Sequence, residues 1–190
     1  MTTRLLSLAE ISVIEHSGAL GAATFPYALR ALMTRWEAAL RDPETATRLL
    51  FYIHEGSTMP PQYSRIEAAT LPDAGQVIAE AGGEDALSAD ALFGLGLLLH
   101  WQAWPFGDDA QWTTTARRWA QLAVEREPES RVFREWQFFR GERADTLGPR
   151  IYIEPEAHAR FHGRGAFGAR MLDLLIRALQ PASATEKRGP

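Results

Sequence analysis

SADALFGLGLLLHWQAWPFGDDAQWTTTARRWAQLAVEREP, residues 88–128, is the stretch with the clearest helical pattern in this chain. A leucine-rich run follows two N-cap candidates, Ser88 and Asp90, and predicts a helix over 89–104. A Pro-Phe-Gly-Asp-Asp turn then interrupts the pattern. A second helix with a buried tryptophan-and-alanine face is predicted after the turn, because apolar residues recur there at helical spacing: Trp112, Ala116, Trp119 and Ala123.

Helical periodicity also dominates outside this stretch. Apolar stripes predict helices over 4–16 and 167–179, and a shorter helix is predicted over 73–81, before Gly82-Gly83. Pro26 and Pro43 suit the first turns of two more helices, the second of them behind an Asp42 cap. No alternation of strands and helices is present, which excludes Rossmann and barrel folds.

We therefore predict an all-α protein, either a bundle or a short superhelix of about seven or eight helices. The only β-forming stretch is Arg150–Ile153, which we interpret as at most one short extended segment. A single domain is expected over 1–180, because this length suits one hydrophobic core. Residues 181–190 are polar and predict a disordered tail.

Composition restricts the possible functions. The 190 residues are 46% hydrophobic and 23% charged, as in folded proteins, and contain no cysteine, which excludes disulfides and thiolate metal sites. The longest apolar stretch, Ala91–Leu99, is far shorter than the roughly 20 residues of a membrane span. With no signal peptide pattern and a net charge of −4, we expect a cytoplasmic protein that binds neither membranes nor nucleic acid.

Tryptophan is unevenly distributed. Five of the six tryptophans fall within 36 residues, and three of the six lie on apolar helical stripes and are interpreted as core: Trp36, Trp119 and Trp136. Trp101, Trp104 and Trp112 instead gather about the Pro-Phe-Gly turn. Aromatic residues at such a turn fit either core packing or an interface anchor.

Charge is uneven too, since residues 61–110 have a balance of −7 and residues 111–170 a balance of +3. A surface with both signs suits the orientation of a protein partner. We therefore predict a non-catalytic interaction domain without a cofactor, whose partner is another protein or a second copy of the chain. Its predicted contacts are an aromatic anchor and an arginine rim: Trp104, Phe106, Arg117, Arg134 and Arg140.

Residues 92–128 place small residues and a proline at regular positions of two predicted helices. Leu95-Gly96 stands in the first helix, Ala116 and Ala123 lie in the second, and Pro128 follows. This pattern resembles a tetratricopeptide repeat, in which the proline occupies the closing position. The gap between the glycine and the first alanine is longer than in the family. The resemblance implies a helical hairpin of an interaction module, in which small residues allow the two helices to approach closely.

The alternative function is a small helical protein or enzyme that holds a metal or cofactor. His158 and His162 share one face of a helix with Glu154 one turn earlier, so the three could bind a divalent metal; two surface histidines are the competing interpretation. His100, on the leucine-rich helix, is either a haem ligand or a hydrogen-bonded core histidine. His54-Glu55 fits an acid–base pair or a histidine at a helix C-terminus.

Overall fold

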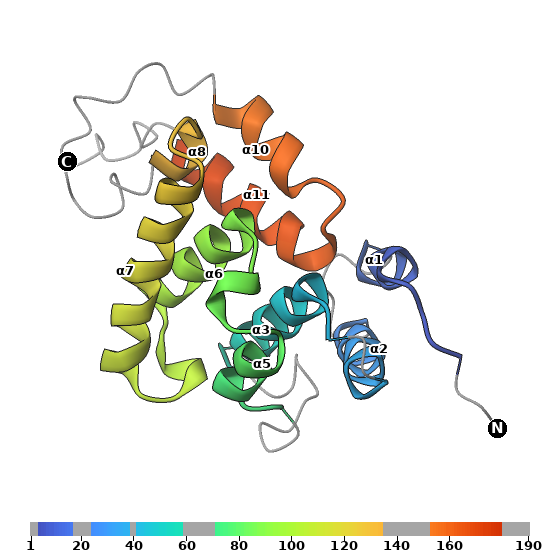
Figure 1. Ribbon diagram of the computed structural model, residues 1–190. Helices are drawn as coiled ribbons and strands as arrows, with labels where there is room; N and C mark the ends of the chain where they lie inside the picture. The colour runs from blue at the N-terminus through green and yellow to red at the C-terminus, as the bar shows by residue number, and fades with distance from the viewer. Residues whose placement is uncertain (1–3, 17–23, 39–40, 59–70, 135–152, 180–190) are drawn as a thin grey trace, which may run out of the picture.

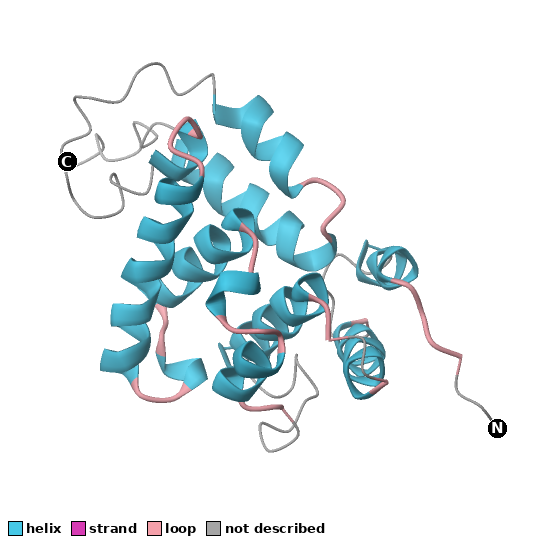
Figure 2. Ribbon diagram, viewed as in Figure 1, coloured by secondary structure: helices cyan, strands magenta, loops and turns pink. Residues whose placement is uncertain are grey.

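A computed structural model describes residues 4–16, 24–38, 41–58, 71–134 and 153–179 (Figure 1). Every regular element within these ranges is helical, which confirms the predicted all-α class (Figure 2). In chain order the α-helices are α1 (Leu8–His16), α2 (Phe25–Glu37), α3 (Pro43–Thr58), α5 (Ala74–Glu80), α6 (Ala89–Trp101), α7 (Asp109–Arg126), α8 (Arg131–Arg134), α10 (Ile153–Phe161) and α11 (Gly165–Leu179). Two short 3₁₀ helices, η2 (Glu84–Ala86) and η3 (Trp104–Phe106), precede and follow α6.

Side-chain caps begin several of these helices. Ser88 Oγ accepts the Ala91 N–H at 3.2 Å at the start of α6, as the sequence predicts. Asp42 accepts the Thr45 N–H at 2.9 Å, and Pro43 is the first residue of α3. Each cap satisfies a backbone donor that the first helical turn leaves unpaired.

Helix α6 is the centre of the fold, with α7 on one side and α3, α10 and α11 on the other (Figure 1). Gly96 allows α7 to approach closely, because a Cβ at this position would lie 3.0 Å from the Ala116 carbonyl oxygen. Ala116, Ala120 and Ala123 are fully buried along the same contact. The buried apolar residues form one connected cluster around this helix.

Two sequence predictions differ from the observed elements. Helix α6 ends at Trp101 and not at residue 104, because Gln102 turns into an extended conformation before η3 begins. Ile153 is the first residue of α10, whereas the sequence indicated an extended segment near 150–153; residues 150–152 lie outside the described ranges. With α10 the described ranges contain nine α-helices, which agrees with the predicted all-α architecture of about seven or eight.

A buried ion pair joins α1 to α3. Arg48 Nη1 lies 3.2 Å from Glu15 Oε2, and the two side chains are 4% and 0% exposed. Tyr52 donates its hydroxyl to Glu15 at 3.1 Å, and Arg48 also donates to Ser12 Oγ at 2.8 Å. Burial raises the pKa of Glu15, although Arg48 opposes that shift. Burial and the Glu15 carboxylate raise the pKa of Tyr52 far above its ordinary value, so its hydroxyl remains a donor.

From Arg48 the ion pairs continue across the molecule. Arg48 and Arg164 both pair with Glu44, and Arg164 also pairs with Asp90 at the start of α6. Arg160 on α10 then connects Asp90 at 3.0 Å to further carboxylates on neighbouring elements. Side chains from α1, α3, α6, α10 and the loop before α11 therefore belong to one connected network.

None of the helices in the described ranges is both long and apolar enough to cross a membrane. The predicted tail over 181–190 lies outside these ranges, as do Trp136 and Arg140.

Candidate functional site

The turn after α6 divides the clustered tryptophans into two groups. Trp101 and Trp104 are 50% and 53% exposed. Phe106, by contrast, is only 7% exposed, and Trp112 is also buried. Two large aromatic side chains therefore reach solvent from a turn whose other aromatic residues belong to the core.

The buried aromatic rings hold this turn against the core through a series of ring contacts. Phe106 meets Trp112 edge to face, with ring centroids 5.1 Å apart, and Trp112 meets Trp119 in the same manner at 6.1 Å. Such arrangements are favoured by the ring quadrupoles. Trp119, at the inner end, donates its indole N–H to Glu84 at 3.0 Å. The rings therefore tie η3 and α7 to the segment before α6.

A histidine from α3 holds the backbone of the same turn. His54 Nε2 lies 3.1 Å from the Gln102 carbonyl oxygen, and His54 Nδ1 lies 3.3 Å from Glu55 Oε1. A carbonyl oxygen can only accept, so Nε2 carries the hydrogen of that bond. Arg170 on α11 lies 3.7 Å from the same Glu55 oxygen. The structure therefore connects α3 and α11 to the turn through buried polar groups.

The predicted role of His54 and Glu55 changes with this placement. Both side chains are buried, and α3 continues to Thr58, so His54 does not lie in the last turn of the helix. The helix-terminus interpretation of His54 is therefore wrong. His54 instead supports the turn through its bond to the Gln102 backbone, and no local sequence signal could predict that bond because 48 residues separate the partners.

The predicted arginine rim is spread over the molecule. Arg117 is exposed on α7, and Arg134 stands beyond the opposite end of that helix from η3. The 18 residues of α7 rise about 27 Å at 1.5 Å each, so Arg134 cannot share a compact surface with Trp104. Arg134 donates to the Glu129 carbonyl oxygen at 3.0 Å. Arg140 is not among the described residues.

The residues of the alternative metal site do not form a ligand set. Glu154, His158 and His162 are exposed on and just after α10. Across the described ranges, no group of three or more histidine, aspartate or glutamate side chains lies close enough to hold a metal ion. His100 is half-buried in the last turn of α6.

Comparison of the chain with known protein families, curated proteins and solved structures finds no match. The tetratricopeptide resemblance of residues 92–128 therefore stays a prediction, although α6 and α7 do pack as a hairpin through small residues.

Proposed function

We propose that this protein is a non-catalytic interaction domain that binds another protein through Trp101 and Trp104. The observation that carries the proposal is their exposure on a turn whose backbone is fixed by His54 and whose other aromatic residues are buried. A half-exposed tryptophan offers roughly 100 Å² of mostly apolar surface to a partner. Because the turn is already ordered, little conformational entropy would be lost on binding.

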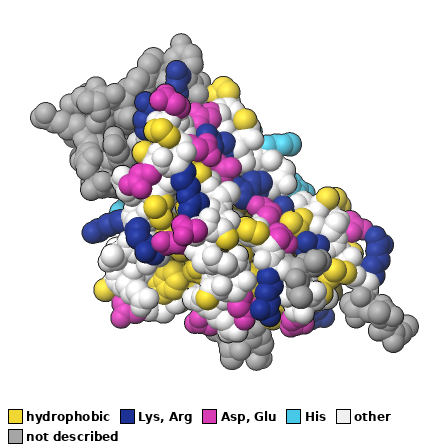
Figure 3. All heavy atoms as spheres, viewed as in Figure 1, with side chains coloured by type: hydrophobic (Ala, Val, Ile, Leu, Met, Phe, Trp, Pro, Cys, Tyr) yellow, Lys and Arg dark blue, Asp and Glu magenta, His cyan; other side chains and the backbone are white. Residues whose placement is uncertain are grey.

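The distribution of charge on the molecular surface also favours a protein partner. On the face seen in Figure 3, basic and acidic side chains are interspersed rather than gathered by sign. A nucleic-acid site normally needs a concentrated basic surface. An apolar centre with mixed charges around it is the usual composition of a protein interface.

Two sequence predictions are part of this proposal in modified form. Trp104 remains the central contact, and Trp101 takes the place of Phe106, whose ring is covered by Trp112 and His54. The tetratricopeptide resemblance supports an interaction role, because the insertion that lengthens the hairpin is the segment that carries Trp104.

The test is a double variant, Trp101→Ala with Trp104→Ala, compared with the unmodified chain. Proteins captured from the native host are identified for both chains, and the dissociation constant is then measured with the purified partner. We expect a loss of affinity of at least about tenfold, as at interface hot spots. The melting temperature should fall by no more than a few degrees, since both side chains are half-exposed.

Trp119→Phe is the matched control, because it changes a tryptophan of the same cluster that is buried. This variant should lose stability while the folded fraction binds the partner normally. Unchanged partner affinity in the double variant would contradict the proposal. Light scattering identifies a second copy as the partner if the unmodified chain is a dimer and the double variant a monomer.

A further inference from the structure

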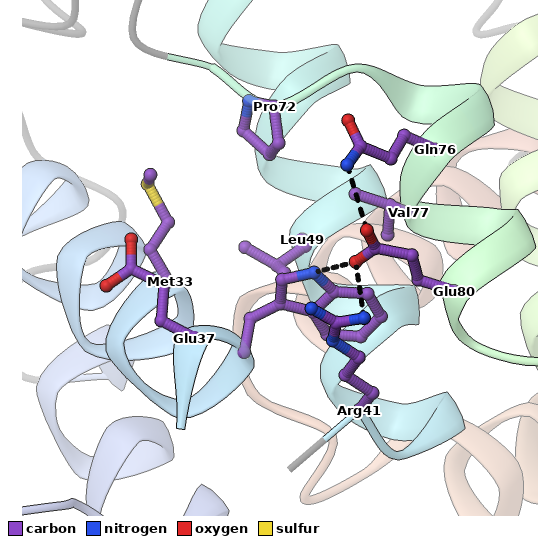
Figure 4. Close-up of a pocket in the computed structure, with 9 residues that line it drawn as sticks. Met33, Glu37, Arg41, Leu49, Pro72, Gln76, Val77 and Glu80 are labelled. Atoms are coloured by element: carbon purple, nitrogen blue, oxygen red, sulfur yellow. Dashed lines mark hydrogen bonds and ion pairs between the residues drawn. The ribbon is translucent and has the colours of Figure 1, made fainter. Parts of the chain in front are cut away.

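A cavity of about 200 Å³ lies where α2, α3 and α5 meet (Figure 4). Figure 4 shows Met33 and Glu37 on one side, Gln76, Val77 and Glu80 on the other, and Pro72 near the top. Trp36 and Leu49 contribute further apolar surface. The volume is below the roughly 300–1,000 Å³ typical of sites for drug-sized ligands, so only a small group would fit.

Glu80 presents a fixed carboxylate to this cavity. Gln76 Nε2 donates to Glu80 Oε1 at 2.8 Å, and the Trp36 indole N–H donates to Oε2 at 3.0 Å. The bond from Gln76, with smaller effects from the Arg41 charge and the Trp36 bond, lowers the pKa of Glu80. The group therefore stays ionised at neutral pH, with both oxygens held in place.

The corner between Trp36 and Glu80 already contains a guanidinium group. Arg41 Nη1 lies 3.3 Å from Glu80 Oε2, and its Cζ lies 5.8 Å from the centroid of the Trp36 ring. The Arg41 side chain is 46% exposed, and an ion pair with this exposure contributes only about 0–1 kcal/mol. A ligand with the same head group could replace it at small cost.

The charges around the cavity leave one carboxylate uncompensated. Glu37 lines the side opposite Glu80, is exposed, and forms no ion pair within the described part of the chain. Among the described residues that line the cavity, two carboxylates and the Arg41 guanidinium sum to −1. An anion would be repelled here, whereas a cation would be attracted.

We propose that this cavity binds a small organic cation, with a guanidinium or primary ammonium head on a short aliphatic chain. The head would lie between Glu80 and the Trp36 face, in place of the Arg41 guanidinium, and donate hydrogen bonds to the Glu80 carboxylate, while the negative charge of Glu37 across the cavity attracts it. The aliphatic chain would contact Met33, Leu49 and Val77. This inference is independent of the interaction proposed for Trp101 and Trp104.

A second tryptophan–glutamate–arginine set shows what distinguishes this corner. Trp119 donates to Glu84 at 3.0 Å, and Arg118 pairs with the same carboxylate. Neither Trp119 nor Glu84 lines the cavity. The combination of tryptophan, glutamate and arginine therefore does not by itself make a binding site. The proposal depends on the cavity beside Glu80 and on Glu37 across it.

Binding is tested by titration of n-butylguanidinium into the full-length protein. Nitrogen–proton NMR follows the indole N–H of Trp36, whose resonance is assigned through a Trp36→Phe variant. We expect this resonance to shift, with a dissociation constant in the millimolar range, while the Trp119 indole stays unchanged. n-Butylammonium should bind too, and n-butyrate and n-butanol should bind at least about tenfold more weakly.

Three variants and one control sharpen the test. Glu80→Gln keeps an acceptor for Trp36 but removes the charge, and should weaken n-butylguanidinium binding about tenfold. Glu37→Gln, at an exposed position, should weaken it severalfold without affecting folding. Arg41→Ala removes the competing guanidinium and should tighten binding up to about fivefold. Glu84→Gln is the matched control and should leave the affinity for n-butylguanidinium unchanged.

The proposal is overturned if n-butyrate or n-butanol binds as tightly as n-butylguanidinium. It is equally overturned if Arg41→Ala and Glu37→Gln both leave the affinity unchanged, or if the Trp36 and Trp119 indoles respond alike. Since Glu37 and Arg41 reach solvent, this decision does not depend on whether Glu80→Gln folds.

Discussion

Two regions of this molecule are stabilised in opposite ways. The α6–α7 hairpin is apolar, and Gly96 and the buried alanines bring its helices close together. The junction of α1, α3 and α11 instead buries the charged pair Glu15 and Arg48. Close apolar packing contributes stability at any pH, whereas a buried ion pair must offset the cost of desolvating both charges. The two regions should therefore respond differently to substitution, pH and salt.

The largest effect is expected from Arg48→Met. It leaves the Glu15 carboxylate buried without its counter-charge, which should lower the free energy of unfolding by about 3–5 kcal/mol. Urea denaturation measures the change. Arg134→Met removes an arginine whose side chain is half-exposed and should cost less than about 1 kcal/mol. Equal losses in the two variants would show that the Glu15–Arg48 pair contributes no more than a surface pair.

The same variant should be sensitive to pH. Burial raises the pKa of Glu15, so the folded state binds a proton more readily than the unfolded state between the ordinary glutamate pKa and the raised one. The stability that the protonated Glu15 side chain contributes is therefore complete below the ordinary glutamate pKa, and it is lost as the pH rises through the raised pKa. Without Arg48 the pKa of Glu15 should rise further. The deficit of Arg48→Met should therefore shrink between pH 7 and pH 5, and a constant deficit would contradict the explanation.

Gly96→Val should have the next largest effect, at the other region. The added side chain meets the Ala116 carbonyl oxygen and must force α6 and α7 apart, at a cost of about 1–3 kcal/mol. The loss should be the same at pH 5 and pH 7. Ala110→Val, on the exposed first turn of α7, measures the effect of valine on helix formation alone and should cost less than about 1 kcal/mol.

A smaller effect is expected from Arg160→Lys. Arg160 contacts Asp90, Glu127 and Glu156 at 2.8–3.0 Å and lies 4.5 Å over the Phe133 ring. Lysine keeps the charge but loses the planar fork and the stacking, so we expect a loss of about 1 kcal/mol. The loss should decrease in 0.5 M salt, measured by thermal unfolding, because salt screens partly exposed charges.

The apolar region could be predicted from the sequence, and the charged one could not. Helical spacing and caps such as Ser88 are local signals, so the hairpin and the burial of Trp119 follow from them. Glu15 and Arg48 are 33 residues apart, and Arg164 and Glu44 are 120 apart. Arginine and glutamate look the same in sequence whether they pair in the interior or face solvent, and only the packing of helices decides between these.

The candidate sites show the same division. The sequence indicates an unusual aromatic turn, but its apolar stripe does not define the residue at which α6 ends. Trp101 and Trp104 face solvent because α6 ends at Trp101. Trp36 is buried, as the sequence predicts. Its cavity was not predicted, because Glu80 reaches it only once α5 packs against α2 and α3.

The contact between α1 and α11 sets the earliest point during synthesis at which this chain can complete its fold. Gly165 has a φ of +62°, and a Cβ there would collide with the Glu15 carboxylate, which also bonds the Ala166 N–H. The cover of Glu15 thus comes from residues that follow it by 150 positions. At 5–20 residues per second a ribosome needs roughly 8–30 s to add them. Until then Glu15 lacks the cover that α11 provides, so the charged junction can close only after α11 has been synthesised.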